Sequence, residues 1–78
     1  MTPSQCRAAR GLLQWTQPQL ATASGVHGRT VSHFESEVVV PRRASLRVMR
    51  VAFEAAGVIF VEETSDGGPG VRLRKGLR

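Results

Sequence analysis

One short stretch, residues 28–36, carries on one side a group of side chains that could recognise another molecule by hydrogen bonding. At about 100° per residue of a helix, its small and polar members fall within one arc of roughly 140°. They are Gly28, Arg29, Ser32, His33 and Ser36. The opposite side holds Val31 and Phe34, which are expected in a core. The spacing therefore predicts a helix with one anchored face and one face that is available for binding.

This chemistry is recognition, because no catalytic or metal-binding constellation is visible. His27 and His33 are six residues apart and would point to different sides of a helix. One cysteine and two histidines give no zinc-ligand spacing. The glycine-rich run at 67–70 lies within a predicted hairpin turn and not between a strand and a helix, as a phosphate-binding loop would. We therefore expect no enzyme, no cofactor and no metal.

A second short helix must position this segment, and its boundaries are well marked. Thr16 followed by Gln19 is the signature of a capping box, in which each residue satisfies a backbone N–H of the other. Gly25 favours a sharp turn, because glycine tolerates positive φ. Ala21 is small enough to allow a close helix crossing, and Val26 is placed to fill the corner. The stretch 16–36 is thus predicted to be two helices joined by a tight turn.

Seven residues at fixed offsets in this stretch resemble the DNA-binding helix-turn-helix of the lambdoid phage repressor and Cro proteins, the Xre-like family of small bacterial and phage regulators. They are Gln17, Leu20, Ala21, Gly25, Val26, Val31 and Phe34. The resemblance runs from about Cys6 to Gly57. It implies a mainly α fold, a four-helix lambda-repressor-like helix-turn-helix domain over residues 1–57. Ser24, at a usually apolar position, and Glu37, where the family commonly has a helix-ending glycine, depart from the pattern; the helix may run on past Glu37 or end there with a strained residue.

By this resemblance, the helix at 28–36 would enter the major groove of double-stranded DNA. Arg29 is the first candidate for base reading, since its guanidinium fork matches O6 and N7 of guanine. His33, Ser32 and Gly28 are weaker candidates. The residues expected to contact phosphates are Gln17, His27, Ser36, Arg42, Arg43 and Arg10.

Two of these expectations have plain alternatives. In the resembled family an arginine at the position of Arg10 pairs with a glutamate at the position of Glu35; two solvated surface charges are the alternative. Arg42 and Arg43 follow Pro41 in the loop 37–45, and they could be an ordinary solvated pair of arginines.

Two further helices complete the expected helical domain, over residues 3–14 and 45–56. The first should face the core with Cys6, Ala9, Leu12 and Leu13. The second should do so with Leu46, Met49, Phe53 and Ala56, and it ends at Gly57. Val48 and Val51 lie off this stripe and would leave apolar surface exposed.

The remaining residues, 58–78, read as a β-hairpin extension. VIFVEE is rich in β-branched residues, SDGGPG is turn chemistry and VRLR alternates strictly. Val71 and Leu73 can cover one face of the first strand, which leaves its other face without a partner in the hairpin. We expect the hairpin to pack on the helix at 45–56, to form a dimeric sheet, or both. The expected dimer interface is Val58, Ile59, Phe60 and Val61. The last residues, KGLR, should be frayed.

Charge and composition agree with a DNA partner without establishing it. The formal charge is +5, and residues 1–57 hold seven basic and three acidic side chains. The lone cysteine, Cys6, lies in an apolar helical stretch and suits a reduced, buried residue of a cytoplasmic protein. No apolar run approaches the ~20 residues that span a bilayer, and no signal peptide is apparent.

These features predict a bacterial or phage-like, nucleoid-associated, sequence-specific transcriptional regulator. It would be a homodimeric repressor that reads an inverted repeat, although some small family members activate. The alternatives are an antitoxin-like protein that binds DNA and a partner protein together, or a protein-interaction module, such as an anti-activator, that kept the fold and lost DNA binding.

Overall fold

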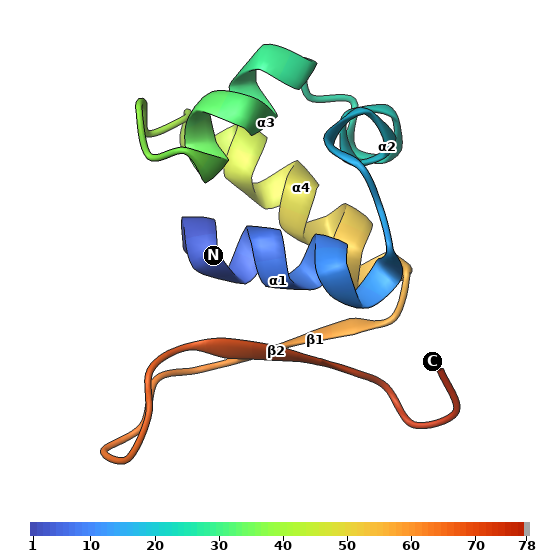
Figure 1. Cartoon of the computed structure of the whole chain (residues 1–78), viewed down its shortest axis with the longest axis vertical. Helices are drawn as coiled ribbons and strands as arrows, with labels where there is room; N and C mark the ends of the chain where they lie inside the picture. The colour runs from blue at the N-terminus through green and yellow to red at the C-terminus, as the bar shows by residue number, and fades with distance from the viewer. Residues whose placement is uncertain (78) are drawn as a thin grey trace.

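The computed structural model describes residues 1–77, and it contains four helices followed by a two-stranded antiparallel hairpin (Figure 1). The elements are α1 (Pro3–Leu13), α2 (Gln17–Ser24), α3 (Gly28–Glu35), α4 (Arg43–Ala55), β1 (Val58–Val61) and β2 (Gly70–Leu73). The expected mainly α content and the hairpin are confirmed. No helix among the described residues is long and apolar enough to cross a membrane.

The helices enclose one core, and α4 runs through the middle of it (Figure 1). The α2 and α3 helices lie on one side of α4, α1 lies on the other, and the hairpin crosses beneath α1. The largest fully buried side chains are Phe53, Leu20, Met49, Val31 and Cys6. They come from all four helices, so each helix contributes to a shared apolar interior.

Local signals in the sequence set the ends of α2. The Thr16 side chain accepts a hydrogen bond from the Gln19 N–H at 3.2 Å, and the Gln19 side chain accepts one from the Thr16 N–H at 2.7 Å, which confirms the capping box. Gly25 closes the helix in the left-handed region at φ 76°, and its N–H donates to the Ala21 carbonyl at 2.9 Å. Val26 is buried directly after this turn, as expected. The chain is thereby directed into α3.

The α3–α4 connection differs from the expected 37–45 loop. Helix α3 ends at Glu35 and does not run on past Glu37. Glu37 takes a strained left-handed conformation at φ 62°, as expected for a residue that replaces a helix-ending glycine. Helix α4 begins at Arg43, two residues before the predicted start. Pro41 restricts the residue that precedes it but not those that follow, so a helix can start soon after it.

The hairpin is oriented against the helices. Val58 pairs with Leu73 and Phe60 pairs with Val71, so these four residues share one face. That face packs on α1 and α4, where Val58 and Phe60 are buried and Val71 and Leu73 join the core. This corrects the expectation that the whole run 58–61 faces a partner molecule. Only Ile59 and Val61 lie on the outer face, because strand side chains alternate between the two faces.

Helix α1 buries a narrower stripe than predicted. Cys6 and Ala9 are fully buried and Leu13 packs on the core, but Leu12 is exposed. Leu12 lies about 60° round the helix from Ala9, at the edge of the stripe. Gln5 is buried instead, and its amide donates to the carbonyl of Gly70 at 3.0 Å and to that of Val61 at 3.5 Å.

The chain after β2 folds back against Gly57, and the expected fraying of KGLR stays a prediction. The Arg74 N–H donates to the Gly57 carbonyl at 2.9 Å, and the Leu77 N–H donates to the Arg74 carbonyl at 3.2 Å. Gly57 has φ 106°, and the Leu77 side chain occupies the space that a Cβ on Gly57 would need. The last residue of that predicted segment, Arg78, lies outside the described residues.

Gly57→Ala should therefore destabilise the protein by about 1–2 kcal/mol, because alanine is strained at positive φ and displaces Leu77. Gly11→Ala is the matched control: it lies inside α1 with open space around it, and the added methyl should stabilise by about 0.5–1 kcal/mol. Urea unfolding followed by circular dichroism measures both. Equal stability of the two variants would contradict this account of Gly57.

Candidate nucleic-acid interface

Helix α3 is divided into an anchored face and an outward face. Val31, Phe34 and Glu35 are buried. Arg29 is exposed, and Gly28, Ser32 and His33 are half-buried on the side that the core does not cover. All four candidate base-reading residues therefore come from one short helix. This helix can present a fork of N–H donors, an imidazole and a hydroxyl to an external surface.

The start of α3 brings two other candidates together. His27 is the N-cap, and its Nδ1 accepts a hydrogen bond from the Arg29 N–H at 3.1 Å. It thus opens the helix, as predicted, and its ring is fixed beside Arg29. An open groove next to it is lined by Gly25, Val26, His27, Thr30, Arg42, Ala44, Ser45 and Val48. Arg42 and His27 consequently border the same surface.

The other end of α3 carries Ser36, and α4 begins with Arg43. The Ser36 hydroxyl is exposed, and it donates to the Ser32 carbonyl at 2.7 Å. The exposed Arg42 immediately precedes α4 and Arg43 opens its first turn, and Arg42 makes no side-chain cap. Within the described chain neither arginine forms an ion pair.

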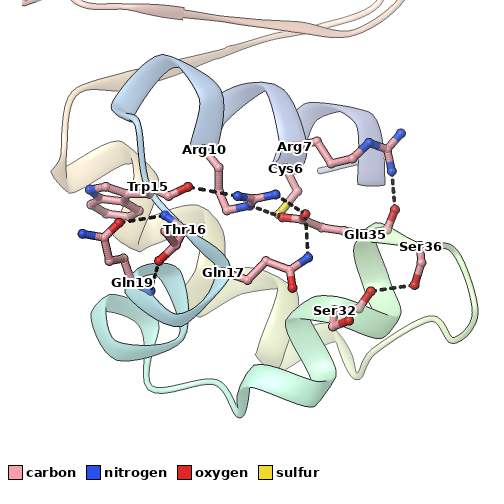
Figure 2. Close-up of polar contacts among 10 residues, drawn as sticks. All are labelled: Cys6, Arg7, Arg10, Trp15, Thr16, Gln17, Gln19, Ser32, Glu35 and Ser36. Atoms are coloured by element: carbon pink, nitrogen blue, oxygen red, sulfur yellow. Dashed lines mark hydrogen bonds and ion pairs between the residues drawn. The ribbon is translucent and has the colours of Figure 1, made fainter.

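A buried carboxylate ties α3 to α1 and α2 (Figure 2). Glu35 accepts hydrogen bonds from Arg10 Nε and Nη2, each at 2.7 Å, in a bidentate ion pair. It also accepts from Gln17 Nε2 at 3.1 Å and from the Cys6 thiol at 3.1 Å. The Glu35 side chain is 3% exposed and that of Arg10 is 21% exposed. Three helices thus converge on one charge.

The expected Arg10–Glu35 pair is therefore present, but two proposed phosphate contacts are directed inward. The remaining terminal nitrogen of Arg10, Nη1, donates to the Trp15 carbonyl at 2.9 Å, so all three guanidinium nitrogens bind protein acceptors. The Gln17 amide donates to Glu35 and the residue is half-buried. Both side chains hold helices together, in contrast to the exposed Arg42 and Arg43.

Burial and this hydrogen bonding shift three ionisation equilibria. Burial alone would raise the pKa of Glu35, but hydrogen bonds from Arg10, Gln17 and Cys6 outweigh it and hold the pKa below its usual value. The hydrogen bond to Glu35 raises the pKa of Arg10. Burial, followed by the hydrogen bond to Glu35, raises the pKa of the Cys6 thiol, which stays protonated and donates to the carboxylate. The cluster thus holds one ion pair and one neutral thiol.

Sequence reasoning missed Arg7, which fixes the end of α3. Its guanidinium donates to the Glu35 carbonyl and, at 3.1 Å, to the Ser4 hydroxyl; it also lies 3.9 Å from the Glu37 carboxylate. Arginine near a helix C-terminus satisfies carbonyls that have no partner in the helix. The sequence offered one signal for this role: Arg7 lies three residues before Arg10, so both side chains are on neighbouring positions of one helix.

The arginines near α3 and the acidic hairpin connection lie at opposite ends of the longest axis of the molecule (Figure 1). The α3 end carries arginines that make no ion pair within residues 1–77: Arg29, Arg42, Arg43 and Arg47. The hairpin connection at the opposite end carries Glu62, Glu63 and Asp66. The hairpin and the tail after it also carry Arg72, Arg74 and Lys75, so basic and acidic residues balance there, whereas the four arginines near α3 have no acidic partner within residues 1–77.

The chain matches no family model, and no curated protein matches it. Within residues 1–77 no group of three or more His, Cys, Asp or Glu residues could hold a metal ion. The arrangement of α3 and its surrounding arginines is consequently the basis for the functional proposal.

Glu35→Gln should destabilise the protein by about 3 kcal/mol at neutral pH, since it leaves Arg10 without a charged partner. Because the pKa of Glu35 is lowered in the folded protein, its contribution to stability is complete above the ordinary glutamate pKa of about 4.3 and is lost as the pH falls through the lower folded value. The variant should therefore lose less stability on acidification than the parent does.

Urea unfolding between pH 7 and pH 2 measures both effects. Glu54→Gln is the control, because Glu54 forms an exposed pair with Arg50 and should contribute less than about 1 kcal/mol. A steep acid transition that is unchanged in Glu35→Gln would assign the acid sensitivity to other groups.

Proposed function

We propose that the protein is a sequence-specific DNA-binding transcriptional regulator in which α2 and α3 act as a helix-turn-helix of the Xre-like kind. The observation that carries the proposal is the division of α3: Val31, Phe34 and Glu35 are buried, while Arg29 is exposed within an arginine-rich surface. A helix that is fixed along one side and cationic along the other fits the major groove, which is just wide enough for a helix.

Base reading is assigned to the outward face of α3. Arg29 reads a guanine, because its planar fork can donate to both O6 and N7. Ser32 and His33 supply weaker contacts, and the missing side chain of Gly28 permits a close approach to a thymine methyl. The buried Glu35 cluster supports this assignment, since it fixes α3 relative to α1 and α2 before DNA binds.

Phosphate contact is assigned to the groups that flank α3. Arg42 is exposed and lines the groove that contains His27, Arg43 is the exposed residue that follows it, and Ser36 is exposed at the other end of α3. Such contacts position the protein and carry no sequence information. The acidic hairpin connection lies at the far end of the molecule, where it would not repel the DNA.

The protein would act as a homodimer on an inverted repeat, with two copies of α3 about one helical turn (~34 Å) apart. Occlusion of a promoter is the simplest mechanism, so we propose a repressor of the bacterial or phage-like, nucleoid-associated type. In vitro selection from a random duplex library tests the proposal: enrichment of a palindromic site is expected. Absence of affinity for any duplex at low salt would refute DNA binding.

Arg29→Ala should weaken binding to the selected site by about 1–3 kcal/mol and relax preference at one base position. Arg72→Ala, which removes the same charge from an exposed position of β2, is the control and should leave base preference intact. Competition titrations with duplexes substituted at each position measure the effect. An unchanged preference in Arg29→Ala would remove this residue from base reading.

Arg43→Ala should weaken binding to all duplexes alike, because a phosphate contact does not depend on sequence. The slope of log K against log[salt] should fall by about one unit, since one fewer phosphate is neutralised. Titrations at several salt concentrations on selected and random duplexes measure this. A loss confined to the selected duplex would instead make Arg43 a base-reading residue.

A further inference from the structure

The connection between α3 and α4 carries an unusual run of exposed aliphatic residues. Val38, Val39 and Val40 are 67%, 53% and 84% exposed. This valine segment protrudes at the edge of the domain beside the end of α3 (Figure 1). Three consecutive exposed valines form a larger apolar patch than the scattered aliphatic residues that are normal on a protein surface.

The valine segment also forms one wall of an apolar groove. The groove is lined by Met1, Thr2, Pro3, Phe34, Glu37, Leu46 and the three valines. A protruding apolar segment therefore lies directly beside an apolar recess on the same edge of the molecule. Such a surface is self-complementary, because each of two copies related by a twofold axis can place its valines in the recess of the other.

The backbone of the valine segment is available as well. Among residues 1–77, neither Val39 nor Val40 takes part in a backbone–backbone hydrogen bond. β-Branched residues with unpaired N–H and C=O groups can pair with a strand of another chain. Charge flanks the valine segment on both sides: Glu37 lies 3.9 Å from the Arg7 guanidinium, whereas Arg42 and Arg43 make no ion pair within residues 1–77 and oppose the approach of a second copy.

From these observations we infer that the valine segment and its groove form the contact between two copies of this chain bound to adjacent half-sites. This inference rests on the proposed function and names the partner surface that it needs. Because the valine segment lies beside the end of α3, two copies that meet there bring their α3 helices near each other, as neighbouring half-sites one helical turn (~34 Å) apart require.

The alternative surface, the outer face of the hairpin, does not meet this requirement. Strand β1, which carries Ile59 and Val61 on its outer face, lies at the end of the long axis opposite α3 (Figure 1). Two copies joined there would carry their α3 helices at the outer ends of the assembly. They could not lie on one face of a duplex one helical turn apart.

The size of the contact indicates when it forms. Three valines and a shallow groove supply less than the ~800 Å² per partner of a standard stable interface. Arg29, Arg42 and Arg43 of two copies also repel each other until phosphates neutralise them. The copies are therefore separate in dilute solution and associate on DNA, where neighbouring half-sites raise their effective concentration. Binding to the inverted repeat is cooperative for this reason.

A pair of double variants tests the contact without changing charge. Val39→Gln/Val40→Gln should leave affinity for a single selected half-site within twofold of the parent, and it should remove the roughly tenfold cooperativity expected on the full site. Ile59→Gln/Val61→Gln, the matched control on the hairpin, should keep that cooperativity. Circular dichroism verifies that both variants are folded. Loss of cooperativity only in the hairpin variant, or in neither variant, would overturn the inference, as would a parent protein that binds DNA without cooperativity.

A cross-linking experiment separates this inference from the proposed function, because it needs no DNA. Val39→Cys should form a disulfide-linked dimer under mild oxidation at millimolar protein much faster than Val61→Cys does. Cys6 can stay in place, since it is fully buried and its thiol is protonated. Equal or slower cross-linking of Val39→Cys would overturn the valine contact. A parent protein without affinity for any duplex would refute the proposed function and leave the cross-linking result to decide the contact.

Discussion

The arrangement of the helices depends on the carboxylate of Glu35. It is almost completely removed from water, and it is stabilised there by a bidentate arginine, an amide and a thiol from two other helices. An isolated charge at this depth would cost several kcal/mol, so the site exists only when all of its partners are in place. The same group that makes the interior polar therefore specifies the relative positions of α1, α2 and α3.

This constraint acts on the binding surface through α3. The helix has only eight residues, so its own hydrogen bonds do not keep it in place. Val31 and Phe34 bury its inner side, Glu35 fixes its rotation, and Arg7 binds the carbonyl at its end. Four arginines near α3 are left without acidic partners in the described chain, and the acidic residues of the hairpin connection are held at a distance. Rigidity on one side and unpaired positive charge on the other together define the candidate interface.

Residues that act on their near neighbours in the sequence made the ends of α2 and the two faces of α3 predictable. Thr16, Gln19 and Gly25 act within a few residues of themselves, so the ends of α2 follow from the chain alone. The alternation of core and surface in α3 also follows from its period. The Arg10–Glu35 pair was accessible only through a family resemblance, because 25 residues separate the partners.

Features set by packing between distant segments were not predictable in this way. The hairpin carries apolar residues on both faces of β1, and periodicity does not say which face meets the helices. The burial of Gln5 and the exposure of Leu12 depend on where the hairpin lies across α1. The side chain of Gln17 points inward because it binds Glu35, which is 18 residues further along the chain. In each case the deciding neighbour belongs to another element.

The amide of Gln5 has a wider consequence. It lies on the first turn of α1 and donates to the carbonyls of Val61 and Gly70, a cross-strand pair at one end of the hairpin ladder. Helix α1 thus contacts two other parts of the molecule: its Arg10 binds Glu35 of α3, and its Gln5 binds both strands of the hairpin. Opening of the hairpin removes the two carbonyl partners of the Gln5 amide and uncovers the apolar side of α1 together, so we expect the two regions to share one unfolding event. A shortened chain that lacks the hairpin is consequently expected to be less stable than the whole chain, and amide protons of β1 and α1 should exchange with solvent through the same opening.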